Sequence, residues 1–142
     1  MASISLKLPD EIEKKLSSLG NRLDDVAAKI LTAGGEVVLK EAKDNLAAVI
    51  GSGTKYPSRA TGELQRALGL SPVRVGPKGT HNVKVGFDEP HSGGVSNAML
   101  AALLEYGKHG QAAKPFMKPA KRSSKDAAIE AMKEAFRQEV GE

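Results

Sequence analysis

The sequence contains no cysteine and no tryptophan, and aromatic residues make up only 4% of its 142 residues. The lack of cysteine excludes a disulfide framework, a thiolate metal site and a cysteine nucleophile. The scarcity of aromatic residues predicts a thin core built mainly from Ala, Leu and Val, with limited stability to spare.

Long apolar runs are also missing. The N-terminus, MASISLKLPDEIEKKL, lacks the apolar segment of a signal peptide, and the apolar stretches elsewhere are broken by Gly or charge. We therefore expect neither a signal peptide nor a membrane-spanning helix, and no membrane partner. The length and the 40% apolar content instead predict a single domain over 1–142, with a short N-terminal arm at 1–8.

The net charge of +4 is concentrated downstream, where a run of basic residues has no acid between its members: Lys108, Lys114, Lys118, Lys121, Arg122 and Lys125. Such a patch can face an acidic partner or nucleic acid, or it can be a solvated surface. Because only Tyr106 and Phe116 are interleaved with it, sequence-specific or single-strand nucleic-acid recognition is weakly supported.

Periodicity in the first third of the chain predicts one strand and two helices. SISLKLP alternates as an edge strand or arm that ends at Pro9, and a short helix follows that Gly20 ends. A long helix over about 21–50 comes next, and the pair Gly34 and Gly35 predicts either a kink or a close approach by another segment. A helix longer than a compact core needs suggests contact with a neighbouring subunit.

The remainder predicts a hairpin between helices. A mobile connector at 51–62 leads into a short helix over 62–70, and alternating apolar residues over 73–75 and 83–87 predict a hairpin. After a loop at 88–96 we expect a helix ending at Gly107 and a last helix from Phe116 or Pro119 to Val140. The order predicts an α+β fold, with a long N-terminal helix and C-terminal helices packed on a small, mainly antiparallel sheet.

No pattern of reactive residues indicates an enzyme. His81, His91 and His109 fall in predicted turns, without the spacing or the partner carboxylates of a metal site. GSGTK lacks the spacing of a phosphate-binding loop, and no Ser lies in a nucleophile elbow. We therefore predict no catalytic residue, no cofactor and no metal.

A DNA-binding function is an alternative. ISLKLPDEIEKKLSSLG, followed by a second amphipathic helix, is similar to a ribbon-helix-helix unit, in which paired strands from two chains enter the major groove. The solvent face of the predicted strand, formed by Ser3, Ser5 and Lys7, contains a single basic residue. The sequence therefore gives little support to a ribbon-helix-helix unit.

The segment LEYGKHGQAAKPFMKPA, residues 104–120, is the most informative part of the chain. Pro115 and Pro119 fix the backbone on either side of Phe116. This ring is expected to pack the last helix onto the sheet, to contact a partner, or to do both.

This segment, together with the upstream blocks TGELQRAL and PDEIEKKLSSLGNRLDDVAAKILTAGGEVVLKEAKDNL, resembles the small head-to-tail joining, or tail-completion, proteins of long-tailed bacteriophages. In that family the three blocks occur in the same order. The resemblance spans residues 9–120, and its most specific part is E-Y-G followed, after a short spacer, by P-F-x-x-P-A.

The resemblance implies a non-enzymatic virion component of a tailed bacteriophage or prophage, made in the host cytoplasm. It would assemble with copies of itself into a ring, for which a hexamer is one option, at the neck between the portal-connector and the tail tube. Other neck and tail proteins would be its partners, and the loops at 51–60, 88–96 and 107–114 are expected to order in the ring. The assembly interface would include Glu105, Tyr106, Gly107, Lys108, Lys114, Pro115, Phe116 and Pro119.

Overall fold

The computed structural model describes residues 3–49, 63–76, 80–87, 97–107, 110 and 112–140. The elements are β1 (Ile4–Lys7), α1 (Asp10–Leu16), the 3-10 helix η1 (Ser17–Arg22), α2 (Leu23–Val49), α3 (Glu63–Ala67), β2 (Leu68–Leu70), β3 (Arg74–Val75), β4 (His81–Phe87), α4 (Asn97–Tyr106) and α5 (Met117–Val140).

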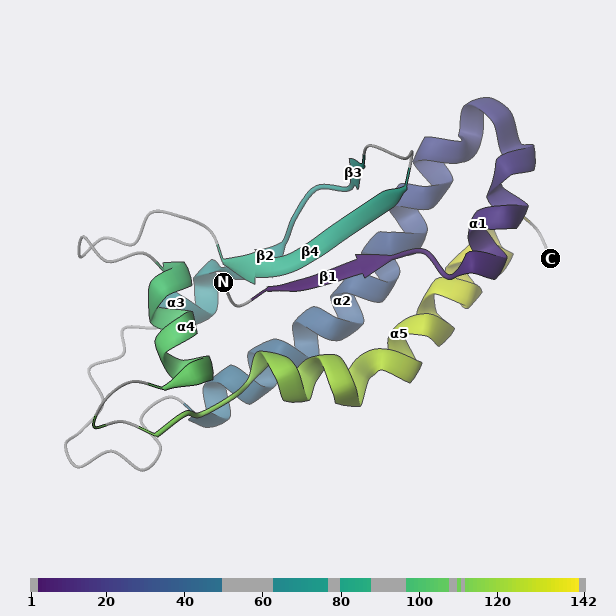
Figure 1. Cartoon of the computed structure of the whole chain (residues 1–142). Coiled ribbons are helices and arrows are strands. Elements are labelled where there is room, and N and C mark those ends of the chain that lie inside the picture. The colour runs from purple at the N-terminus through teal and green to yellow at the C-terminus, as the bar shows by residue number, and fades with distance from the viewer. Residues whose placement is uncertain are drawn as a thin grey trace.

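A four-stranded sheet lies over α2, and α5 runs alongside α2 (Figure 1). The predicted α+β fold is confirmed. The predicted connector at 51–62 and the loop at 88–96 lie outside the described residues.

The sheet is antiparallel and has β4 at its centre. β1 pairs with one side of β4, while β2 and β3 pair with the other side. Side chains alternate between the two faces, so that Ile4 and Leu6 are buried toward the helices whereas Ser5 and Lys7 are exposed. One face of the sheet therefore builds the core and the other faces outward, as in other one-sided antiparallel sheets. The predicted strand at the N-terminus and the predicted hairpin are both confirmed.

The edge formed by β2 and β3 is interrupted by a bulge. Leu70 lies opposite Val85, but Arg74 lies opposite Asn82, so the register shifts by one residue between them. Ser71 keeps the ladder going at the break, because its N–H donates to the Lys84 carbonyl at 2.8 Å and its Oγ accepts from the Lys84 N–H at 2.9 Å. Pro72 follows and has no N–H to donate, as is common at sheet edges and bulges.

Two local predictions in this region are wrong. The short helix predicted over 62–70 ends at Ala67, because Leu68–Leu70 pairs with β4 and buries Leu68 in the core. His81 was expected in a turn but is the first residue of β4, and its Nε2 lies 2.8 Å from Asp24 Oδ1 at the start of α2. In both places tertiary pairing outweighs local propensity.

Helix α2 is continuous, and its two adjacent glycines allow close packing against two different elements. A Cβ added at Gly34 would lie 2.6 Å from Met132 Cγ of α5, and one added at Gly35 would lie 2.5 Å from Leu70 Cδ1 of β2. Both distances are shorter than carbon atoms tolerate. Of the two alternatives predicted for this pair, the close approach is therefore the one that the structure contains.

Helix α5 packs on α2 through a ridge of residues spaced four apart. The ridge is buried and consists of Ala120, Ser124, Ala128, Met132 and Phe136. Rows of this spacing are the ridges by which helices interlock, and the small residues in the first half permit a close approach. Because α5 runs along α2 within the same chain, α2 does not overhang its domain as expected. Contact of α2 with a neighbouring subunit stays a prediction.

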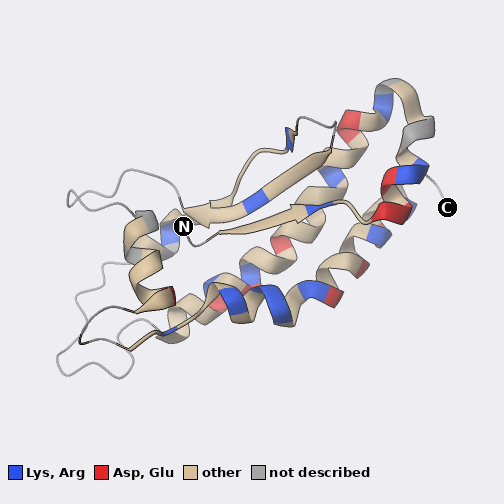
Figure 2. Cartoon of the chain, viewed as in Figure 1, with Lys and Arg blue, Asp and Glu red and all other residues tan. Residues whose placement is uncertain are grey.

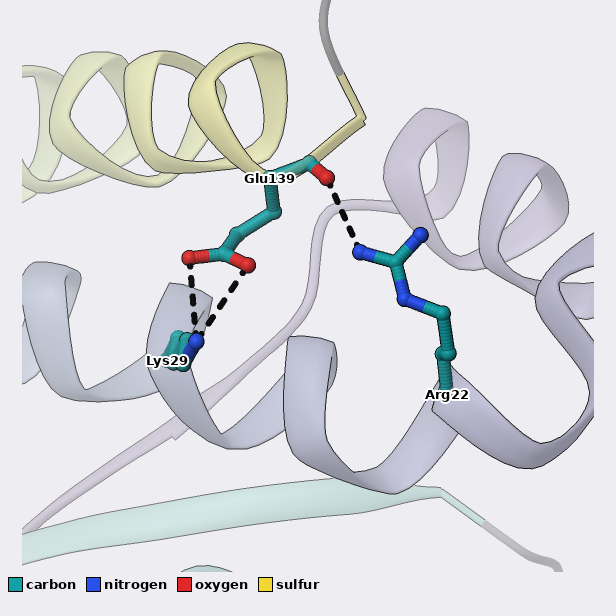
Figure 3. Close-up of polar contacts among 3 residues, drawn as sticks. All are labelled: Arg22, Lys29 and Glu139. Atoms are coloured by element: carbon teal, nitrogen blue, oxygen red, sulfur yellow. Dashed lines mark hydrogen bonds and ion pairs between the residues drawn. The ribbon is translucent and has the colours of Figure 1, made fainter.

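The C-terminal end of α5 contacts the end of η1 and the first two turns of α2 (Figure 3). Arg22 Nη2 donates to the Glu139 carbonyl at 3.1 Å, and Lys29 Nζ lies 3.4 Å from each carboxylate oxygen of the same residue. Carbonyl groups in the last turn of a helix have no partner within the helix, and a cation there also complements the helix dipole. Since Arg22 and Lys29 are exposed, these contacts mainly set the position of the helix end.

The fit at Gly34 predicts a stability effect whose sign depends on the residue at position 132. Gly34→Ala should lower the free energy of unfolding by up to about 2 kcal/mol, since overpacking costs about 1–3 kcal/mol and the gain in helix propensity is about 1 kcal/mol. Urea denaturation followed by circular dichroism measures the change.

Two further variants test the cause. In a Met132→Ala background the same Gly34→Ala change should become stabilising, because the atoms that it would meet are gone. Gly69→Ala in strand β2 is the control for an added methyl group without a clash, since no heavy atom lies within 4 Å of an added Cβ there. A Gly34→Ala protein that is more stable than the parent would contradict the close packing described above.

Candidate assembly surface at the junction of α4 and α5

The junction between α4 and α5 is built from a helix end, a returning connection and a helix start. Gly107 has φ +77 and donates its N–H to the Leu103 carbonyl at 2.9 Å, which ends α4 as predicted. The Lys114 N–H then donates to the Leu104 carbonyl at 2.7 Å. The chain therefore leaves α4 and comes back to it immediately before α5 begins.

Glu105 joins the two helices through its carboxylate. Its Oε1 accepts the N–H groups of Phe116 at 3.0 Å and Met117 at 2.8 Å, and its Oε2 accepts that of Lys118 at 3.2 Å. The residue is only 4% exposed. The first N–H groups of a helix have no partner within the helix, and α5 has no acidic residue of its own in its first turn. Glu105 supplies both the acceptors and the negative charge that favour a helix start.

Phe116 packs the start of α5 onto the sheet. It is fully buried, and its ring makes an edge-to-face contact with Phe87 of β4 at a centroid distance of 6.0 Å. Its carbonyl accepts a hydrogen bond from Asn45 Nδ2 of α2 at 3.2 Å. Phe116 thus connects the sheet, α2 and α5, which is the first of the roles predicted for it.

Tyr106 points outward from the same junction. Its side chain is 63% exposed, and Met99, seven residues earlier on α4, is 58% exposed. Residues seven apart lie on one side of a helix, and the half-buried Leu103 lies between them. We call this surface, formed by Met99, Leu103 and Tyr106, the α4 face. Tyr106 was predicted as an interface residue and Met99 was not, although its spacing of seven residues from Tyr106 was a signal.

The other predicted interface residues differ in exposure. Pro115 is exposed, Gly107, Lys114 and Pro119 are half-buried, and Lys108 lies outside the described residues. The contacts of Glu105 and Phe116 are inside the chain, so these two residues can influence assembly only by positioning α5. Participation of the whole set in an interface stays a prediction, and its surface members are the ones that can touch another subunit.

Exposed cations occupy the first two turns of α5, next to the junction (Figure 2). They are Lys118, Lys121, Arg122 and Lys125, which we call the basic stripe. Their spacing of three and four residues places them on one side of the helix. Lys118 lies in the first turn, where positive charge is unfavourable, so the buried Glu105 also offsets the cost of this cation.

The ribbon-helix-helix alternative is not supported by the position of β1. In such a unit this strand pairs with its counterpart from a second chain. Here it pairs with β4 of the same chain, and its apolar residues Ile4 and Leu6 are buried in the core.

A comparison with known protein families shows to which family this chain belongs. A model of the family HK97-gp10_like, described as "Bacteriophage HK97-gp10, putative tail-component", matches residues 10–107. The chain belongs to this family. The match confirms the predicted relation to phage joining proteins, and membership implies association with the virion. The matched region of this HK97-gp10-like protein includes the E-Y-G part of the block that appeared most specific in the sequence and ends before its second part, which begins at Pro115 and Phe116.

Searches of curated proteins and of solved structures find no significant match to the chain. Among the residues that the structure describes, no group of His, Cys, Asp or Glu side chains is arranged to hold a metal ion. None of the described helices is long and apolar enough to cross a bilayer.

Replacement of the buried carboxylate tests its part in fixing α5. Glu105→Gln should lower the free energy of unfolding by about 2–4 kcal/mol, because charge-assisted bonds are lost and an amide N–H₂ faces backbone donors. Glu36→Gln on α2 is the control, since that side chain is exposed. Equal stability of the two variants in urea denaturation would show that the three bonds contribute little.

Proposed function

We propose that this HK97-gp10-like protein is the head-tail joining, or tail-completion, protein of a tailed bacteriophage or prophage. In this proposal, copies of the chain form a ring at the neck between the portal-connector and the tail tube. The protein is non-enzymatic and acts by binding its neighbours. The observation that carries the proposal is the family match over 10–107, because it relates most of the chain to phage tail components.

The α4 face supports an assembly role. Single exposed apolar residues are ordinary on protein surfaces, but here Met99 and Tyr106 share one side of one helix. Tyr and Met are enriched at protein interfaces, where they supply contact area. In a closed ring each contact joins two different patches of the same protein, and the α4 face would be one of the two.

The proposal includes where the protein acts. It would be made in the host cytoplasm and become part of the virion at the head-tail interface, in contact with other neck and tail proteins. Specific nucleic-acid recognition has no part in this role. DNA binding that falls steeply with salt, by a protein that stays monomeric, would instead favour the DNA-binding alternative.

Deletion of the gene from its phage or prophage tests the proposed function. After induction, electron microscopy of the lysate should show filled heads and complete tails that are not joined, and the wild-type gene supplied in trans should restore joined virions. Normal virions from the deletion strain would overturn the proposal. Absence of tails would overturn it as well, since it would place the protein in tail assembly instead of joining.

A variant of the α4 face tests the ring. Tyr106→Glu should raise the protein concentration that is needed for ring formation at least about tenfold, because a carboxylate would be buried without a partner in the contact. Ala127→Glu, an exposed position on α5, should leave assembly unchanged. Sedimentation velocity measures the oligomer, and circular dichroism confirms that both variants fold. Rings of Tyr106→Glu at the wild-type concentration would exclude this face from the subunit contact.

A further inference from the structure

A groove runs along β1 on the side away from β4. Its main part, about 420 Å³, lies between the segment Ile4–Asp10 and the residues of α5 that include Lys121, Lys125 and Ile129. A smaller hollow of about 130 Å³ shares Ile4 and Lys121 with it and extends past Ser3 to Tyr106 and Lys118. We call the two together the β1 groove.

The groove exists because the sheet covers one of the two long helices and not the other. The strands pack on α2, and no described strand makes extensive contact with α5. Neighbouring strands lie about 4.8 Å apart, whereas packed helices lie about 8–10 Å apart, so three strands side by side are narrower than a layer of two helices. The missing width is about that of one further strand, placed beside β1 and above α5.

The edge of β1 that borders this space has no strand beside it in the described part of the chain. At an edge strand, N–H and C=O groups point away from the neighbour at alternate residues and form a template for another strand. β1 is regular over its four residues and ends before Pro9. The groove therefore combines a row of backbone donors and acceptors with a hollow that can hold side chains.

The walls of the groove define the chemistry of what fits. Its floor is apolar and includes Val38, Ala128 and Met132. Its rim holds three cations and one acid, all exposed: Lys7, Lys121, Lys125 and, at one end, Asp10. The three lysines form no ion pair with a residue that the structure describes, and the rim has a net positive charge. Along α5 the side facing the groove carries Lys121, Lys125 and Ile129 at steps of four residues, so two cations are followed by an apolar contact.

We propose that the β1 groove binds an extended acidic segment of another protein, which adds to the sheet as a strand beside β1. Main-chain hydrogen bonds to the edge of β1 would hold the segment, as in other cases of strand addition. Its apolar side chains would enter the floor, and carboxylates at the alternate positions would meet the lysines of the rim. The inference goes beyond the proposed function, because it requires neither a ring nor a neck.

A second copy of this chain is a poor occupant on grounds of charge. Its described strands contain no Asp or Glu and instead carry Lys7, Arg74 and Lys84. Inserting β1, β3 or β4 would place a cation beside the lysines of the rim, where like charges are destabilising, and β2 has no acid to attract them. We therefore take the acidic partner to be a different protein.

The experiment measures binding of the full-length protein to a short end-blocked synthetic peptide in which Val and Glu alternate, labelled for fluorescence anisotropy. A peptide of the same composition with all Val residues before all Glu residues is the control for strand-like alternation, and a Val and Lys peptide is the control for charge. The Val and Glu peptide should bind, the other two should not, and hydrogen exchange of the β1 amides should slow when it is bound.

Charge reversal in the groove distinguishes this site from other surfaces. Lys121→Glu combined with Lys125→Glu should weaken binding of the alternating peptide at least about tenfold, because attraction at the rim becomes repulsion. Lys43→Glu on α2, an exposed lysine outside the groove, should change it less than about twofold. Circular dichroism shows whether each variant is folded.

Three results would overturn the proposal. They are no binding of the alternating peptide, equal binding by the double variant and the wild type, and unchanged exchange of the β1 amides in the complex. A fourth is self-association of the free protein that the double variant abolishes, since this would make a second copy the occupant. None of these results bears on whether heads and tails fail to join after gene deletion, so the two proposals can fail separately.

Discussion

The carboxylate of Glu105, buried where α5 begins, is the interaction on which the arrangement of this molecule depends. It collects three backbone N–H groups from a helix that has no acid of its own in its first turn. This bond set fixes the start of α5 against the end of α4, while Arg22 meets a carbonyl near the other end of α5. A helix held by an anion at its first turn and a cation at its last turn has both ends of its dipole complemented. The wall of the β1 groove, the basic stripe and the outward direction of Tyr106 all follow from this placement.

Much of the fold could be predicted from the sequence because the relevant signals are local. Alternation marked β1 and β4, apolar spacing marked α2, α4 and α5, and Gly107 marked the end of α4. The failures occurred where a distant segment decided the outcome. Leu68–Leu70 reads as a continuation of a helix until β4 is available to pair with it. The length of α2 suggested an overhang because a single sequence does not reveal that α5 will lie along it.

The sequence predicted where the candidate site lies, but not which of its side chains are buried and which are exposed. The prolines and the Tyr and Phe of segment 104–120 indicated a functional region. The sequence did not show which side chains of this segment would be buried. The structure buries Glu105 and Phe116 and exposes Tyr106, because only the first two find partners in the helix start and on the sheet. The β1 groove had no sequence signal at all. It arises from the difference in width between two layers, which is a property of the assembled fold.

The bulge at Ser71 and Pro72 gives the two borders of the sheet unequal properties. The border at β2 and β3 has a shifted register and a residue without an N–H, so a straight strand cannot follow it for more than a few residues. The border at β1 is regular. A sheet of this kind can be lengthened at β1 only, so copies of the chain cannot join the β1 border of one to the β2 and β3 border of the next. The molecule can therefore offer a docking edge without the risk of polymerising into open-ended fibres.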